Sequence, residues 1–489
     1  MQVYDVVVIG AGIMGCTVAR ELSRYKLDVL VLERAHDLGE GSSKANSGII
    51  QAGFHARGGS LKGRSCVEGN ALFPALTQEL EVPYINCGGL MVAFNDIGID
   101  KLREKALRAE MSGAAPMPII SGDEARALEP RLSKRVIAAM WAPTTGIISP
   151  FAFVLALAQN AYSNGVEFRF NSEVEHIERK ASGSQDSCYV VHLKDGRHIA
   201  TRYVANMAGD EAMLLDAQVH PADYIIKPRV GEFLVFDKQD PIDAITHVIY
   251  QAEETDEGGT LLSPTIEGNL LAGPTSRNIS DFLDRRTTRK GLEHVWRVAK
   301  KLIPDLDISK VISNFAGVRT NIANVDKEKK DFIVRVSALR FVSALGIKNP
   351  GMTSSPALAK RVVKLLSEEG LRLEEDEAFS PRRKAYTPFL KCAKKQQDAL
   401  IKNDGSYGRV LCRCESITEG DVRAILASDL APTSLDGLKH RLRTGMGRCQ
   451  GAFCTPRIVS IMAREAGIPE TSVIKGEYGG TLVARRVKP

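Results

Sequence analysis

The stretch VYDVVVIGAGIMG, residues 3–15, decides the fold of this chain. It joins a β-branched apolar run, typical of a buried parallel strand, to glycines in G-x-G-x-x-G spacing. Apolar residues then recur at helical spacing over 16–26, and a second apolar strand over 28–32 ends in Glu33. This strand–turn–helix–strand unit predicts a dinucleotide-binding site, without separating FAD from NAD.

Each glycine of the turn has a physical role in such a site. Gly10 permits the tight turn, Gly12 lets the backbone approach a pyrophosphate, and Gly15 allows the helix to pack closely on the strand. The helix N-terminus offers free N–H groups to the phosphates. Glu33 is placed to accept hydrogen bonds from the ribose hydroxyls.

Length and composition indicate a globular protein of two or three domains, since the chain has 489 residues, 44% of them hydrophobic and 25% charged. Lysine and arginine number 65 against 59 acidic residues, and the net charge of +6 forms no basic tail. We therefore expect no nucleic acid partner, but an anionic small molecule or an acidic protein. We find no signal peptide and no apolar run of transmembrane length, and so expect a cytoplasmic protein.

A small, hydroxyl-rich loop, GEGSSKANSG at 39–48, follows the acidic residue. With the glycine turn it resembles the D-amino-acid-oxidase-like superfamily of flavoproteins, in the branch of glycerol-3-phosphate and L-2-hydroxyglutarate dehydrogenases. An expected strand over 167–174, the segment YVANMAG at 203–209 and the segment GIKNPGMTSSP at 346–356, which leads into an expected helix over 357–366, agree with that resemblance.

The resemblance spans about residues 1–370 and implies an α/β fold with FAD as cofactor. It implies a Rossmann-like FAD-binding domain with an inserted mixed-sheet α+β substrate domain, built from about 76–145 and 211–310. The residues that it places along FAD are Gly10, Gly12, Ile13, Met14, Gly15, Glu33, Arg34, Ser42, Ser43, Asn46, Ser47, Gly48, Val174, Ala208, Gly209, Gly346, Gly351, Met352 and Thr353.

The segment GIIQAGFH at 48–55 should lie against the flavin, and here the chain departs from the family. The branch usually has a histidine at the position of Gln51, and glutamine orients a substrate without serving as a base. His55 is the substitute base that we consider, with an exposed loop histidine as the alternative. The lysine that many relatives carry near Gly258 is also absent.

Three cationic residues are candidates for binding an anionic substrate. Arg319, in the segment GVR, matches the family arginine that binds the acidic group of the substrate, which also makes it a catalytic-site candidate. Arg229 and Lys348 add positive charge near the expected pocket. A surface ion pair is the alternative for Arg319 and Arg229, and a solvated side chain is the alternative for Lys348. Arginine suits carboxylate or phosphate because its guanidinium donates two parallel hydrogen bonds.

Four of the nine cysteines form two close pairs near the C-terminus: Cys412 with Cys414, and Cys449 with Cys454. Four thiolates satisfy either a zinc ion or a [2Fe–2S] cluster, and C-x-C spacing is unusual for zinc. Disulfides or unligated thiols remain a further alternative. An intracellular chain with clustered cysteines favours a metal site.

The run RTGMGRCQGAFC at 443–454 resembles the bacterioferritin-associated-ferredoxin-like [2Fe–2S] domain. This resemblance implies that the four cysteines bind a [2Fe–2S] cluster in a small helical domain over 406–475, after a connector over 371–405 and before a tail over 476–489. From the residues we expect Ser416 or Thr418 to cap a helix over 421–428 and a last helix over 455–466.

A flavin and a cluster in one chain together predict a dehydrogenase. The flavin takes two electrons from the substrate and a cluster passes one at a time, which suits transfer to another protein. We expect oxidation of glycerol 3-phosphate, with a second flavoprotein or another acceptor subunit in a hetero-oligomeric complex. A dehydrogenase of a 2-hydroxy acid such as L-2-hydroxyglutarate, an amino acid dehydrogenase and a non-catalytic electron-transfer flavoprotein subunit stay open.

Overall fold

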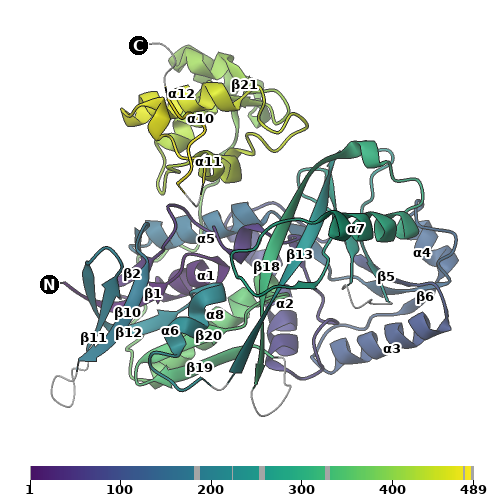
Figure 1. Cartoon of the computed structure of the whole chain (residues 1–489), viewed down its shortest axis with the longest axis horizontal. Coiled ribbons are helices and arrows are strands. Elements are labelled where there is room, and N and C mark those ends of the chain that lie inside the picture. The colour runs from purple at the N-terminus through teal and green to yellow at the C-terminus, as the bar shows by residue number, and fades with distance from the viewer. Residues whose placement is uncertain are drawn as a thin grey trace.

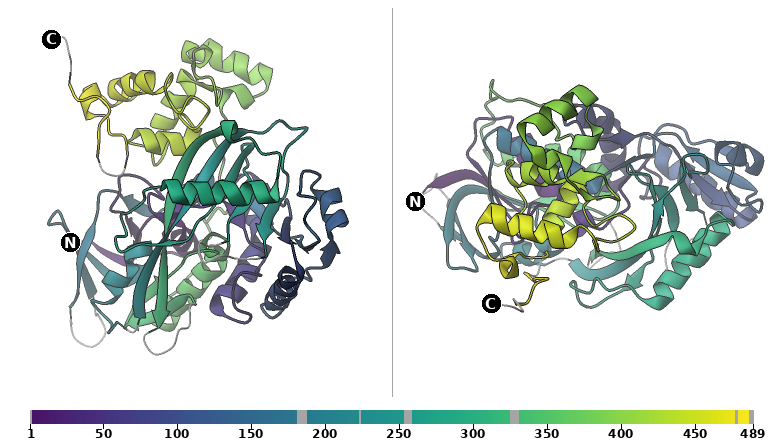
Figure 2. Two further views of the ribbon diagram at one scale, coloured as in Figure 1. Left: turned by 45° about the vertical axis from the view of Figure 1, so that its right-hand side comes forward. Right: turned by 90° about the horizontal axis from the view of Figure 1, so that it is seen from above.

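The computed structural model describes residues 2–180, 188–222, 224–252, 259–324, 331–476 and 479–485, without the side chains of residues 188, 320, 323 and 324. The turn at Gly258 lies outside these residues. Two sheets lie side by side, and the C-terminal helices form a separate lobe on one side of both (Figures 1 and 2). No helix in the described ranges is long and apolar enough to cross a membrane.

Eight strands of the described chain form the sheet that carries the glycine turn. Its central strand β1 (Val3–Ile9) runs parallel to its neighbours β2 and β12, which confirms the predicted Rossmann-like unit. The other strands are β2 (Val29–Leu32), β9 (Glu167–Arg169), β10 (Val174–Lys180), β11 (Cys188–Leu193), β12 (His198–Asn206), β19 (Ile333–Ala338) and β20 (Phe341–Leu345).

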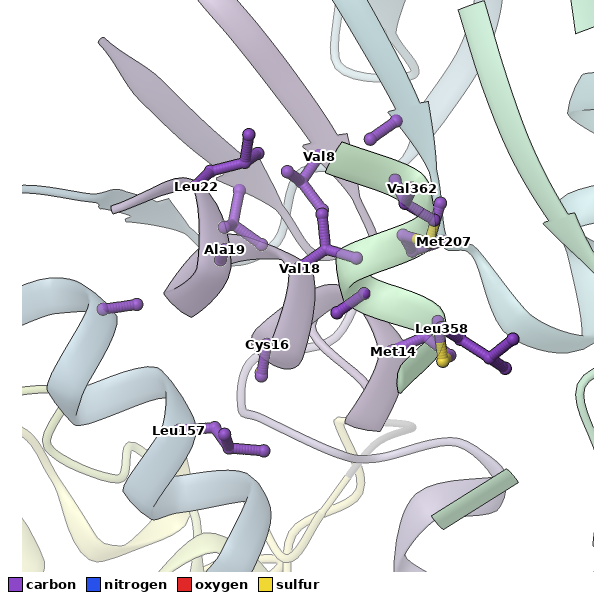
Figure 3. Packing of buried hydrophobic residues seen from close by; sticks show 14 of the residues in the cluster. Val8, Met14, Cys16, Val18, Ala19, Leu22, Leu157, Met207, Leu358 and Val362 are labelled. Carbon is purple, nitrogen blue, oxygen red and sulfur yellow. The ribbon is translucent and has the colours of Figure 1, made fainter. Parts of the chain in front are cut away.

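The helix after the glycine turn packs closely because it has no side chain at Gly15. A Cβ atom there would lie 1.8 Å from the carbonyl oxygen of Gly10. Val18 of this helix is fully buried in one hydrophobic cluster with Leu358 and Val362 (Figure 3). The helices of this part are α1 (Ile13–Leu22), α2 (Leu61–Glu79), α5 (Pro150–Ser163), α6 (Ala212–Asp216) and α8 (Gly351–Glu368).

A second, mixed sheet forms the predicted substrate domain. Within the described ranges its nine strands are β5 (Gly89–Ala93), β6 (Ile119–Ser121), β7 (Ala138–Ala142), β13 (Tyr224–Lys238), β14 (Val248–Gln251), β15 (Leu261–Pro264), β16 (Asn269–Gly273), β17 (Arg277–Asn278) and β18 (Val311–Asn324). β14 and β5 pair in parallel, whereas β13 and β18 pair antiparallel over nearly their whole length. β18 therefore belongs to this sheet, although it lies beyond the expected segment 211–310.

Three further helices and a small sheet complete this region. The helices are α3 (Asp96–Glu110), α4 (Gly122–Leu128) and α7 (Arg289–Leu302). The small sheet consists of β3 (Ile49–Ile50), β4 (Tyr84–Ile85) and β8 (Gly146–Ile148), and it carries the chain from the hydroxyl-rich loop to Gln51.

Several sequence-based boundaries were wrong, three of them in the Rossmann-like part. The expected strand over 167–174 is interrupted, because Asn171 has a left-handed φ of 50° and its N–H and that of Ser172 bond the loop after β2. The first helix ends at Leu22 and does not continue to residue 26. The helix expected over 357–366 begins at Gly351, since the N–H of Ser354 already bonds the carbonyl of Pro350.

The C-terminal lobe has its own small core, which includes Val422, Leu438 and Ile458. Thr418, not Ser416, caps α10 in a capping box with Asp421, so this helix runs over Glu419–Leu426 and not over the predicted 421–428. The last helix matches the prediction at both ends. The elements are α9 (Lys394–Asn403), β21 (Val410–Cys412), β22 (Ile417–Thr418), α10 (Glu419–Leu426), α11 (Leu435–Leu442) and α12 (Thr455–Ala466).

A buried ion pair fastens this lobe to the Rossmann-like part. The guanidinium of Arg441 donates hydrogen bonds of 2.6 and 2.8 Å to the two carboxylate oxygens of Asp37, and both side chains are at most 4% exposed. A Cβ at Gly437 would lie 2.1 Å from the same carboxylate, so α11 approaches as closely as glycine allows. Beside it His440 stacks on Phe151, with ring centroids 4.5 Å apart.

Replacing Arg441 with methionine should loosen this contact. The change leaves Asp37 buried and unpaired, and breaking a buried pair in this way costs about 3–5 kcal/mol. We expect faster amide hydrogen exchange in α11 and in the loop around Asp37, measured by mass spectrometry. Arg103→Met is the matched control, because Arg103 pairs with Asp100 while both side chains are largely exposed. Equal exchange in the two variants would contradict a clamping role.

Candidate functional site

One cavity of about 480 Å³ lies between the glycine turn and the second sheet and gathers most of the predicted site residues. At the nucleotide end it is lined by Gly10, Gly12, Ile13, Met14, Glu33, Arg34, Ser42, Ser43, Asn46, Ser47, Ala208, Gly209, Gly351 and Met352. At the other end it is lined by Gln51, His55, Arg229, Arg319 and Lys348. Residues from seven separate stretches of sequence thus meet at one site.

The nucleotide end is built from backbone groups and short polar side chains. The N–H of Ile13, in the first turn of α1, donates to the Ser43 hydroxyl at 2.9 Å. Glu33 accepts hydrogen bonds from the N–H groups of Ala11 and Ala35 at 2.7 and 2.8 Å. Burial raises the pKa of Glu33, and these two hydrogen bonds oppose that shift. The carboxylate is therefore oriented at the end of β2, where the pattern predicted it.

Five predicted cofactor residues do not line the cavity: Gly15, Gly48, Val174, Gly346 and Thr353. Gly15 and Gly48 instead allow close packing, since a Cβ at Gly48 would lie 2.3 Å from the carbonyl oxygen of Ile148. Gly346 adopts a φ of +65°, and Val174 begins β10. These five residues therefore lie outside the cavity lining.

Gln51 is held from three directions at the substrate end. Its N–H donates to the Thr353 hydroxyl at 2.9 Å, and the amide of Asn70 donates to its carbonyl oxygen at 3.1 Å. The hydroxyl of Tyr250 donates to the side-chain oxygen of Gln51 at 3.2 Å. With that oxygen engaged, the amide N–H₂ group of Gln51 is oriented to donate to a bound hydroxyl.

His55 lies beside Tyr250, with ring centroids 5.3 Å apart, and also lines the cavity. Burial, with the nearby charges of Lys105 and Lys62, lowers the pKa of His55 well below its usual value. The imidazole is therefore neutral at physiological pH and has a nitrogen lone pair available to accept a proton.

Two arginines face each other across the second sheet. Arg229 on β13 and Arg319 on β18 are direct cross-strand partners, so both side chains project from the same face. Burial and the charge of Arg229 lower the pKa of Arg319 to about 10. Within the described chain, the buried Nε atom of Arg229 has no hydrogen-bond partner. Like charges placed opposite each other destabilise a sheet, and an anion bound between them would offset that cost.

Two residues at this end were missed from the sequence. Tyr250 comes from β14, and a single tyrosine in an apolar strand gives no local sign of its role. Lys62, near the start of α2, lies close to Arg319, and burial lowers its pKa to about 8. Lys348, which contacts the side chain of Asn321, lines this end of the cavity, and Lys62 adds positive charge beside Arg319.

The four clustered cysteines meet in the C-terminal lobe in two pairs. The sulfur atoms of Cys414 and Cys449 are 3.7 Å apart, and Cys454 hydrogen-bonds Cys412. That hydrogen bond, with the N–H groups of Glu415 and Gly445, lowers the pKa of Cys412 to about 6. Among the described residues no three ligand-type side chains converge on one ion. Two pairs match a binuclear cluster in which each iron takes two thiolates.

Known proteins share both parts of this architecture. Residues 5–365 match the model of the FAD dependent oxidoreductase family, and residues 410–464 match the BFD-like [2Fe-2S] binding domain. A glycerol 3-phosphate dehydrogenase of Caloramator mitchellensis is 36% identical over 99% of both chains. A mitochondrial L-2-hydroxyglutarate dehydrogenase of Arabidopsis thaliana is 26% identical over 73% of this chain and 82% of its own.

A solved structure agrees with these matches. The L-alpha-glycerophosphate oxidase of Mycoplasma pneumoniae, with FAD bound, superposes with a TM-score of 0.72 at 27% identity, covering 79% of this chain and all of its own. The cavity fits FAD, because a Cβ at Gly10 would lie 2.7 Å from the carbonyl of Met207 and one at Gly12 would lie 3.2 Å from the Ser43 hydroxyl. Bare backbone at these positions is what a pyrophosphate requires.

We expect each of the four paired cysteines to be needed for the cluster. Cys449→Ser and Cys454→Ser should each lower iron and acid-labile sulfide from two per chain to near zero, because one iron then loses a thiolate. Bound FAD should remain, since the dinucleotide cavity lies in the other part of the chain. Cys392→Ser is the control, as Cys392 bonds backbone carbonyls of its own loop. Full iron content in a ligand variant, or zinc in place of iron, would refute the assignment.

Proposed function

We propose that this chain, which belongs to the FAD dependent oxidoreductase family and carries a BFD-like [2Fe-2S] binding domain, is a glycerol 3-phosphate dehydrogenase. The product is dihydroxyacetone phosphate. The observation that carries the proposal is the pair of opposed, half-buried arginines that line one end of the cavity, Arg229 and Arg319. The printed activity of the Caloramator mitchellensis relative, which matches nearly the full chain, supports the same substrate.

The proposed binding mode follows from charge. Arg229 and Arg319 hold the phosphate, Lys348 of the cavity lining adds positive charge, and Lys62 adds more from beside Arg319. The three carboxylates that line the cavity, Glu33, Glu40 and Asp210, belong to or contact the loops of the nucleotide end. The anion is therefore drawn to one end, and its carbon chain extends toward Gln51.

The proton of the substrate hydroxyl goes to His55 in this proposal. FAD bound in the cavity supplies the two-electron acceptor for the carbon-bound hydrogen. Gln51, oriented by Tyr250, donates a hydrogen bond to the hydroxyl oxygen, and the neutral imidazole of His55 accepts its proton.

The cysteines of the C-terminal lobe give the dehydrogenase its route to a partner. Cys412, Cys414, Cys449 and Cys454 would hold the cluster, which supplies one-electron transfer. We infer that the acceptor is a protein, either a second flavoprotein or another acceptor subunit in a hetero-oligomeric complex.

A 2-hydroxy acid is the second candidate substrate. Gln51 stands where the resembling branch has a histidine, and two arginines hold a carboxylate as well as a phosphate. The similarity to L-2-hydroxyglutarate dehydrogenases favours this class over an amino acid.

Anaerobic titration separates the candidates. Glycerol 3-phosphate should bleach the flavin absorbance, and L-2-hydroxyglutarate or an amino acid should not at equal concentration. Arg319→Gln should weaken glycerol 3-phosphate binding roughly 10- to 100-fold, because a hydrogen bond between charged groups contributes about 1.5–3 kcal/mol. Arg361→Gln, an exposed arginine of α8, is the control. Bleaching by the 2-hydroxy acid alone, or undiminished affinity in Arg319→Gln, would reject the proposal.

The proton-acceptor role of His55 predicts a particular pH dependence. His55→Asn should slow flavin reduction by about 10²- to 10⁴-fold while FAD stays bound. Since the pKa of His55 is lowered, the base form persists as the pH falls through 6.5 and is lost only well below it. Stopped-flow reduction rates should therefore show no histidine titration near pH 6.5. A normal rate in His55→Asn, with exposed His198→Asn as control, would exclude the role.

A further inference from the structure

The two cysteine pairs of the C-terminal lobe differ in how far they are exposed. Cys412 and Cys454 are 2% and 1% exposed, whereas Cys414 and Cys449 are half-buried. The cluster site is therefore asymmetric, with one thiol pair in the core of the lobe and the other toward its surface. An electron leaves a protein most readily where its redox centre comes nearest to the surface.

An unusual apolar side chain stands beside this site. Phe453, in the loop between Cys449 and Cys454, is 77% exposed, although aromatic residues are normally buried. It directly precedes a buried cysteine, so its backbone is fixed by the cluster site while its ring remains in solvent. Its ring is therefore accessible to a partner that approaches the cysteine ligands.

Two arginines adjoin the same cysteines in sequence. Arg413, between Cys412 and Cys414, and Arg457, in the first turn of α12, are exposed, and neither makes an ion pair among the described residues. The N-terminus of α12 adds a partial positive charge at the same place. Arg448 is also exposed, but Asp237 of the second sheet pairs with it at 2.6 Å. The unpaired charge next to the cluster site is thus positive.

We propose that Phe453, Arg413 and Arg457 form the docking surface for an acidic protein electron acceptor. This inference rests on the proposed function, since it assumes that electrons leave through the C-terminal lobe. An apolar centre with a cationic rim suits a protein whose redox centre has an acidic rim, because opposite charges steer encounter and orient the partners.

The anionic surface of a lipid membrane is the competing occupant of a basic and apolar patch. A protein acceptor is favoured, because the residues concerned are neighbours in sequence of the cluster ligands. Lipid headgroups accept no electrons. Both occupants are therefore probed in the same experiment.

The test measures binding without substrate, using a flavodoxin as an acidic carrier, a cytochrome c as a basic carrier and vesicles of phosphatidylglycerol. The wild type should bind the flavodoxin at low ionic strength and lose it as salt rises. Arg457→Glu and Phe453→Ser should each weaken that binding by about tenfold. Arg361→Glu and Ile242→Ser, whose parent residues are exposed elsewhere, should not. Iron content must stay unchanged, and Arg413→Gln serves as a second charge variant.

A second readout follows electrons. The variants of the docking surface should keep flavin reduction by glycerol 3-phosphate at the wild-type rate and slow only the reduction of the flavodoxin. The proposal is overturned if the flavodoxin binds the wild type and all variants equally. It is also overturned if the substitutions weaken binding of the cytochrome c or of the vesicles in place of binding of the flavodoxin. Failure of glycerol 3-phosphate to reduce the flavin of the wild type would instead contradict the proposed function. The binding measurements would still test the docking surface, because they use no substrate.

Discussion

The approach of α1 to the end of β1 is the contact on which the rest of the structure depends. A side chain at Gly15 would collide with the carbonyl of Gly10, so this helix and strand fit together only as they are. The first turn of α1 then fixes the hydroxyl-rich loop through Ser43, and the loop just before it presents Asp37 to the C-terminal lobe. The dinucleotide cavity and the docking of the cysteine-bearing lobe therefore share one support.

Two pairs of charged residues near the contact of α1 with β1 have opposite effects on stability. Arg441 and Asp37 are buried as a matched pair, which makes their contact a strong positional constraint. Arg229 and Arg319 are half-buried like charges directly opposite each other, which costs stability in the free protein. The first arrangement holds two parts of the chain together. The second keeps the cavity ready for an anion, since a bound phosphate relieves the repulsion.

Much of this could be predicted where the signal is local. The glycine spacing before α1 and the acidic residue after β2 depend on residues near one another in sequence, and both were found at their expected places. The four C-terminal cysteines also meet, but Cys414 lies against Cys449 and Cys412 against Cys454, not in the pairs that are close in sequence. The contact of Tyr250 with Gln51 and the opposition of Arg229 to Arg319 arise from strand register between distant segments, which no local pattern encodes. The interrupted strand before Val174 was missed for a related reason, since hydrogen bonds to the distant loop after β2 break it.

The central claim is that substrate oxidation at one end of the chain is coupled to a one-electron centre at the other. Low-temperature electron paramagnetic resonance of the protein, mixed anaerobically with glycerol 3-phosphate, tests it most directly. The account predicts the signal of a reduced [2Fe–2S] cluster together with bleached flavin absorbance. Bleached flavin with a cluster that stays oxidised, in protein of full iron content, would contradict it.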